Sequence, residues 1–118
     1  MSNILIRESE PGDAGYVPYM HGQYYWKNHS FHRSSEYYFI KYLADFVHDP
    51  SGGRLWIAET ENTTIIGSVA IVCFDAKTAQ FRWFLVDEKY QGMGIGSRLI
   101  KTALDFCRDN HLLIYKKC

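Results

Sequence analysis

Three strand-like segments follow one another between residues 54 and 87, and only short turns separate them. The segments are RLWIAE, IIGSVAIVCF and AQFRWFLVD, and they are rich in the β-branched and aromatic residues that favour strands. The turns are TENTT and DAKT. Strands joined by tight turns pair antiparallel. The sequence therefore predicts an antiparallel meander, which the rest of this 118-residue chain has to cover.

A short strand and two helical segments precede the meander. NILIRESE begins with alternating apolar positions, as a first strand does. Residues 14 to about 29 carry apolar side chains at helical spacing behind Asp13, which can cap a helix. In EYYFIKYLADFVHD the aromatics Tyr38, Tyr42 and Phe46 recur at four-residue intervals and predict a second helix.

A third helical segment follows the meander at residues 94–110, with Leu99, Ala103, Phe106 and Cys107 facing one way. LLIY then looks like the start of a fifth strand. The predicted order is β-α-α-β-β-β-α-β, which is an α/β (α+β) fold. Its sheet is mixed but mostly antiparallel and is flanked by helices. The crossover into the fifth strand is expected to be parallel and right-handed.

Charge and composition argue against several classes of protein. Thirteen basic and thirteen acidic side chains cancel, so nothing in the composition favours nucleic acid or a lipid surface as a partner. No apolar segment is long enough to cross a membrane and the first residues lack a signal-peptide core, which predicts a soluble cytoplasmic protein. Three widely spaced cysteines without a Cys-x-x-Cys pair indicate neither a disulfide framework nor a zinc site, and we expect no metal.

Three glycines alternate in QGMGIG, between the last strand of the meander and the third helix. The spacing fits neither a P-loop, which needs a lysine and a hydroxyl after its last glycine, nor a Rossmann fingerprint. It does fit a loop whose N–H groups point at an anion before the positive end of a helix beginning near Gly96, with Gly92 and Gly94 also clearing the approach. Glycines used only for a tight strand-to-helix turn are the competing interpretation.

The same loop carries a family resemblance. QGMGIG matches the Q/R-x-x-G-x-G/A signature of the GCN5-related N-acetyltransferase (GNAT) superfamily through Gln91, Gly94 and Gly96. RWFLVDEKY is similar to that family's fourth strand, and the predicted order of elements is the family's from its first strand onward. GYVPYMHGQYYW and AQFRWFLVDEKYQGMGIG also resemble acetyltransferase domains fused to regulators of the MarR type.

The resemblance implies acetyl-CoA as cosubstrate. Backbone N–H groups of the loop would hold its pyrophosphate, and these belong to Gln91, Gly92, Met93, Gly94, Ile95, Gly96 and Ser97. The backbone of Phe84, Leu85 and Val86 would pair with the pantetheine arm, where the fourth and fifth strands diverge. A backbone N–H at Leu85 or Val86 would stabilise the oxyanion of the transferring acetyl group.

Residues between the first two helices are candidates for proton transfer. Glu36 begins the second helix, beside the loop that shapes the acceptor site in the family, and is the candidate general base. The alternative is a first-turn glutamate that complements the helix dipole. His21, His29 and His32 are further candidates, because an imidazole can take up a proton near neutral pH, and a solvated or core histidine is the competing interpretation of each.

Three further side chains are candidates for binding the acceptor. Trp26 and Phe31 flank the break between the helices and can line an apolar or cation-holding pocket, although helix-spaced aromatics also serve as core. Arg82 can meet an acidic acceptor or pair with Glu59. The partners implied are acetyl-CoA and an amine acceptor, with neither nucleic acid nor membrane.

The family pattern continues beyond the fifth strand with another helix and two strands, and the sequence ends at LLIYKKC. Residues 1–118 are therefore expected to form a single, C-terminally truncated acetyl-CoA-binding acetyltransferase domain, and an incomplete sheet predicts self-association as a homodimer. One hypothesis is an N-acetyltransferase acting on a primary amine of a small molecule, peptide or protein by direct attack. The alternative is a catalytically weak acetyl-CoA-binding or sensor domain that acts through a partner.

Overall fold

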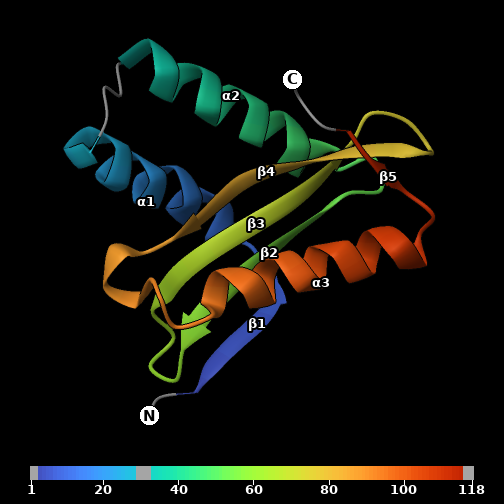
Figure 1. The fold of residues 1–118 in the computed structure, drawn as a ribbon. Coiled ribbons are helices and arrows are strands. Elements are labelled where there is room, and N and C mark those ends of the chain that lie inside the picture. Colours follow the sequence, from blue (N-terminus) through green and yellow to red (C-terminus); the bar gives the residue numbers. More distant parts are fainter. Residues whose placement is uncertain (1–2, 29–32, 116–118) are drawn as a thin grey trace.

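One sheet runs through the protein and carries helices on both faces (Figure 1). The computed structural model describes residues 3–28 and 33–115, and none of their helices is long and apolar enough to span a bilayer. The elements, in chain order, are β1 (Ile4–Glu8), α1 (Asp13–Asn28), α2 (Arg33–His48), β2 (Arg54–Thr60), β3 (Ile65–Cys73), β4 (Thr78–Val86), the 3₁₀ turn η1 (Glu88–Tyr90), α3 (Ile95–Asp109) and β5 (Leu113–Ile114).

The sheet has the strand order β1-β2-β3-β4-β5. Strands β1 to β4 are antiparallel neighbours, so the predicted meander is confirmed and β1 extends it on one side. Strand β5 pairs with β4 in parallel, as expected after a helical crossover, and within the described residues it pairs with Thr78 and Ala79. The predicted order of helices and strands is thus confirmed throughout the described residues.

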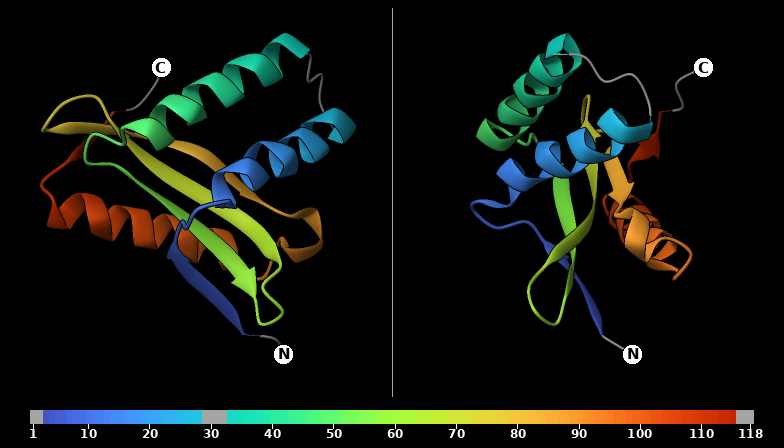
Figure 2. Two further views of the ribbon diagram at one scale, coloured as in Figure 1. Left: turned by 180° about the vertical axis from the view of Figure 1, so that it is seen from behind. Right: turned by 90° about the vertical axis from the view of Figure 1, so that its left-hand side faces the viewer.

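The sheet separates two apolar cores (Figure 2, right). Neighbouring residues of a strand point to opposite faces, so Trp56 of β2 contacts the α3 core while Leu55 and Ile57 contact the α1 and α2 core. Helix α3 buries Leu99 and Cys107, as its periodicity predicts. Helices α1 and α2 lie together on the other face and cross it diagonally (Figure 2, left).

Helix α2 buries a different stripe from its four-residue aromatic repeat. Phe46 is buried with Leu43, but Tyr38 and Tyr42 are half exposed and lie against each other, with 6.3 Å between ring centroids. A spacing of four residues drifts around a helix of 3.6 residues per turn, so three residues at this spacing do not all stay on the buried face. The core-facing stripe is instead completed by Phe39.

An ion-pair cluster ties β1, α1 and β2 together. Arg7 bonds Asp13 at 2.8 Å and Glu59 at 3.1 Å. Asp13 lies in the first turn of α1, and its carboxylate points back toward β1 and also accepts the Glu10 N–H at 2.6 Å. The Arg7 hydrogen bond lowers the pKa of Asp13, so this contribution to stability is present at neutral pH and is lost only in acid. Glu59 pairs with Arg7 and Arg82 donates to Gln80, so the alternative in which Arg82 pairs with Glu59 is not seen among the described residues.

His21 lies in the interface between α1 and α2. Its side chain is 2% exposed, and its Nδ1 lies 2.9 Å from the Val17 carbonyl oxygen, to which it donates. Its ring lies 4.9 Å from that of Phe39, centroid to centroid, and its Nε2 has no hydrogen-bond partner within the described residues. Of the competing interpretations of this histidine, the core residue is the one observed. Burial lowers the pKa of His21 because it penalises the charged imidazolium.

Protonation of this one side chain is therefore expected to lower the stability of the protein as the pH is lowered. The unfolded chain protonates His21 near its ordinary pKa of 6.5, while the folded state binds the proton only at lower pH. The free energy of unfolding should be constant above that value and decrease below it, by up to about 1.4 kcal/mol per pH unit for one group. Denaturant unfolding from about pH 7.5 to 5.5 measures this. His21→Phe should flatten the profile, and the exposed-site control His48→Gln should not. A profile that His21→Phe leaves unchanged contradicts the assignment.

Candidate functional site

The glycine loop joins the end of β4 to the start of α3. Gly92 and Gly94 have φ angles of +83° and +81°, a region that side chains rarely tolerate. Gly94 is the N-cap of α3, which begins at Ile95, one residue before the expected Gly96, and no side chain caps this helix end. A Cβ atom at either of the first two glycines would meet nothing within 4 Å, so both border open space.

The loop leaves a row of backbone donors unused. Within the described residues, the N–H groups of residues 92–97 have no hydrogen-bond partner, and the first bond of α3 runs from the Arg98 N–H to the Gly94 carbonyl at 3.1 Å. These donors lie before and in the first turn of a helix of 15 residues, where the aligned peptide dipoles leave a partial positive charge. The arrangement suits an anionic group such as a phosphate.

Gly96 serves a different purpose from the other two glycines. A Cβ atom there would lie 3.2 Å from Cζ of Phe84 and 3.6 Å from a methyl of Val86. Its φ is not positive, so no backbone constraint requires glycine. Gly96 therefore lets the first turn of α3 approach β4 closely. Of the three glycines, Gly92 and Gly94 border open space, and Gly96 packs against β4.

Gln91 fixes the loop onto the end of β4. Its side-chain Nε2 donates to the Val86 carbonyl at 2.9 Å, and its own N–H is directed to the Glu88 carbonyl at 3.4 Å. The Asp87 carboxylate accepts the Lys89 N–H at 2.9 Å and so caps η1. The Gln91 side chain thus ties the loop to β4 by a hydrogen bond. The spacing of the motif did not reveal this bond.

Strand β4 contains a bulge next to the loop. Its register with β3 shifts between Ser68↔Leu85 and Ala70↔Arg82, which leaves one extra residue on β4. Trp83 there has a φ of +50°, which is strained for a bulky side chain. The buried Ser68 hydroxyl donates to the Trp83 carbonyl at 2.6 Å, and the Trp83 ring lies against Phe46 with centroids 5.5 Å apart.

The bulge and the short β5 expose the backbone of β4. Asp87 donates its N–H to the Ile66 carbonyl at 2.7 Å, and alternate residues of a paired strand face the same neighbour, so Val86 turns its backbone groups away from β3. Within the described residues β5 reaches β4 only at Thr78 and Ala79. A pocket of about 270 Å³ joins this edge to the glycine loop; it is lined by Phe84, Leu85, Val86, Tyr90, Gln91, Gly92 and Gly96.

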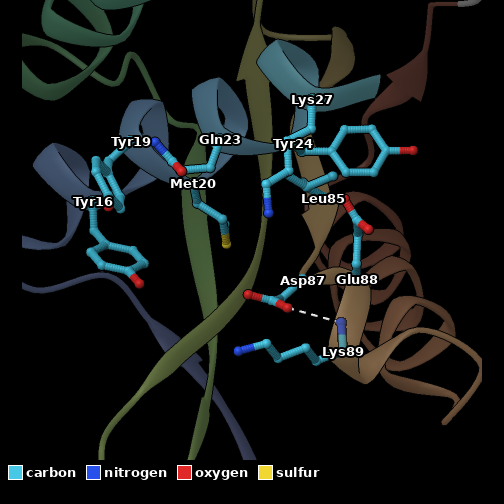
Figure 3. Close-up of a pocket in the computed structure, with 10 residues that line it drawn as sticks. All are labelled: Tyr16, Tyr19, Met20, Gln23, Tyr24, Lys27, Leu85, Asp87, Glu88 and Lys89. Atoms are coloured by element: carbon cyan, nitrogen blue, oxygen red, sulfur yellow. Dashed lines mark hydrogen bonds between the residues drawn. The ribbon is translucent and has the colours of Figure 1, made fainter. Parts of the chain in front are cut away.

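A second pocket lies between α1 and the turn after β4 (Figure 3). Its volume is about 370 Å³, and its walls combine tyrosines with acidic and basic side chains: Tyr16, Tyr19, Met20, Gln23, Tyr24, Lys27, Leu85, Asp87, Glu88 and Lys89. Leu85 belongs to this pocket and to the one along the β4 edge. Both pockets therefore border the same segment of β4.

The other predicted residues border neighbouring pockets or lie elsewhere. Glu36 is exposed and, together with Trp26, lines a pocket of about 300 Å³ that shares Tyr19 and Gln23 with the second pocket. Arg82 donates to Gln80 at 2.8 Å and borders a fourth pocket, beside the C-terminal half of α2. Phe31, His29 and His32 lie outside the described residues.

Sequence reasoning missed the polar lining of the second pocket. Lys27 and Asp87 come from elements far apart in the chain, and no motif connects them. The one available signal was the position of Asp87, which follows the last apolar residue of β4 and precedes the glycine loop. Among the described residues, no cluster of three or more His, Cys, Asp or Glu side chains could hold a metal ion.

Comparisons with known proteins agree with this geometry. The sequence profile of the acetyltransferase (GNAT) family matches residues 19–116, whereas no curated protein matches the chain. A GNAT-family acetyltransferase from Staphylococcus aureus Mu50 superposes with a TM-score of 0.78 at 18% identity, covering 93% of this chain and 69% of its own.

Two similar structures were solved with a nucleotide ligand. The Escherichia coli GNAT-family N-acetyltransferase YhbS, in complex with CoA, has a TM-score of 0.73 at 24% identity and covers 95% of this chain and 60% of its own. A predicted acetyltransferase with acetyl-CoA from Clostridium acetobutylicum has a TM-score of 0.78 at 15% identity, covering 98% and 81%. At these identities the likeness establishes a shared fold.

Proposed function

The chain belongs to the GNAT acetyltransferase family, a family of acyltransferases, and from that premise we propose that it binds acetyl-CoA and transfers the acetyl group to a primary amine. The observation that carries the proposal is the row of N–H groups at residues 92–97, which have no partner in the part of the chain that the structure describes and which lead into the exposed backbone of β4. The donors suit a pyrophosphate, and the strand edge suits the amides of a pantetheine arm.

The register of β4 supports one oxyanion donor over the other. Leu85 lies opposite Ser68, two residues before Asp87. Residues two apart on a strand direct their backbone groups to the same neighbour, so the Leu85 N–H faces β3, as that of Asp87 does. The Val86 N–H faces the open edge instead, and the Gln91 side chain fixes the Val86 carbonyl on that side. We therefore assign to Val86 the donation to the carbonyl oxygen as negative charge develops on it.

The proposed transfer forms one bond and breaks one. An acceptor that binds as an ammonium first gives one proton to solvent, and the neutral amine nitrogen then attacks the thioester carbonyl carbon. The carbon–sulfur bond breaks, the nitrogen loses a second proton as the amide forms, and the departing thiolate takes up one proton. The thioester supplies the activated acyl group, while this chain supplies position, the Val86 donor and exclusion of water. Glu36 stays a prediction for the base, because its pocket is lined by none of residues 84–97.

Calorimetry with acetyl-CoA and with pantetheine tests the binding step. Acetyl-CoA is expected to bind roughly a hundredfold more tightly than pantetheine, which lacks the pyrophosphate, because each charge-assisted hydrogen bond is worth about 1.5–3 kcal/mol. The difference should shrink at high salt. Equal binding of the two compounds would contradict the assignment of residues 92–97.

Release of free thiol with a panel of primary amines then tests transfer. Turnover supports the acetyltransferase. Tight binding of acetyl-CoA without thiol release above the rate in buffer points instead to a catalytically weak acetyl-CoA-binding domain. Light scattering on the same sample tests the expected homodimer, and a monomer alone would contradict that expectation.

A further inference from the structure

The pocket between α1 and the turn after β4 carries opposite charges on facing walls. Lys27 extends from α1 into the pocket toward the Asp87 carboxylate, as Figure 3 shows. Neither side chain has an ion-pair partner among residues 3–28 and 33–115. A cation and an anion that face each other without pairing leave room for a ligand with complementary charges between them.

Asp87 is held rigidly in this pocket. One of its carboxylate oxygens accepts the Lys89 N–H at 2.9 Å, and its backbone N–H bonds the Ile66 carbonyl at 2.7 Å. The other carboxylate oxygen points into the pocket in Figure 3. A fixed carboxylate loses little conformational entropy when it binds an ammonium group, so it is a favourable partner for one.

The rest of the lining suits a small molecule with no net charge. Asp87 and Glu88 are balanced by Lys27 and Lys89, and Met20 and Leu85 supply apolar surface beside three tyrosines and a glutamine. The volume of about 370 Å³ is in the range of small-ligand sites. A net anion or a net cation would meet as much repulsion as attraction here, whereas a zwitterion can satisfy both walls.

We propose that this pocket holds the acetyl acceptor and that the acceptor is a small zwitterion with a primary amine and an acidic group, of the α-amino acid type. Its ammonium lies against Asp87, next to the Val86 edge where the acetyl group is needed, and its acidic group lies against Lys27. This inference rests on the proposed acetyl transfer for the identity of the ligand as acceptor. The charge arrangement of the pocket carries the choice of a zwitterion.

Matched ligand pairs test the inference by binding alone. Each standard α-amino acid is compared with the amine that lacks its α-carboxyl group, by calorimetry on the whole chain with and without CoA. The best amino acid is expected to bind tenfold to a hundredfold more tightly than its amine, the range of one charge-assisted hydrogen bond. Lys27→Met should abolish this preference. Asp87→Asn should weaken both members of the pair.

Two exposed substitutions outside the pocket serve as controls. Lys41→Met and Asp109→Asn make the same changes on α2 and α3 and should alter neither affinity. Equal binding of amino acids and amines, a preference that survives Lys27→Met, or no binding of any pair overturns the inference. If acetyl-CoA binds and simple amines are acetylated at the same rate as amino acids, the inference of a zwitterionic acceptor fails while the proposed function stands. If acetyl-CoA does not bind, the proposed function fails, and the preference between paired ligands is still measurable.

Discussion

Gly94→Val is expected to weaken the binding of CoA by at least about a hundredfold while the protein still folds. Gly94 has a φ of +81° at the N-cap of α3, and an L-residue in the left-handed region costs about 1–2 kcal/mol. A Cβ there would meet nothing within 4 Å, so a side chain at this position enters the open space beside the loop. The isopropyl group would displace the anion from at least one donor, each worth about 1.5–3 kcal/mol. Calorimetric titration with CoA measures the loss.

Two variants separate obstruction from backbone strain. Gly52 also has a positive φ, +89°, and open space around its Cβ position, but it lies in the turn after α2. Gly52→Val should therefore cost similar stability and leave CoA binding intact. Asparagine tolerates this backbone conformation, so Gly94→Asn should fold well. Its side chain still stands in the glycine loop, so the variant should bind CoA poorly. Unchanged affinity in both Gly94 variants would show that the anion lies elsewhere.

The fold could be predicted because its signals are local. The change from alternating to helical periodicity at residue 94, and the short turns of the meander, are written within a few residues of each element. The glycine loop was located for the same reason, since its backbone conformation and the helix end lie within QGMGIG. What such signals identify is a surface that can hold an anion.

The parts that were missed depend on contacts between distant segments. Gly96 was assigned to the anion because nothing in the motif shows that Phe84 lies over it. Trp83 reads as an ordinary strand residue, and its strained φ is stabilised by Ser68 and Phe46, which belong to other elements. The polar pocket is harder still, because Lys27 and Asp87 face each other only after α1 has crossed the sheet.

The second large effect is expected from Leu99, which holds α3 against the sheet. Its side chain is 0% exposed, and its Cδ1 would lie only 3.2 Å from a Cβ at Gly67, so strand and helix are in close contact there. Leu99→Ala removes this contact and leaves a cavity, at a cost of roughly 2–5 kcal/mol of the free energy of unfolding. Denaturant unfolding followed by circular dichroism measures the loss.

A matched substitution on the same helix shows whether burial is the cause. Leu104 is 45% exposed, so Leu104→Ala should cost less than about 1 kcal/mol, and Leu99→Met should cost less than about 1.5 kcal/mol because it conserves volume. Equal losses for both alanine variants would contradict the assignment of Leu99 to the core. Because the amides that we propose to bind the anion lie at the first turn of α3, CoA should bind Leu99→Ala only where the variant is folded. Saturating CoA should then raise its melting temperature, which ties the packing of α3 directly to the site it presents.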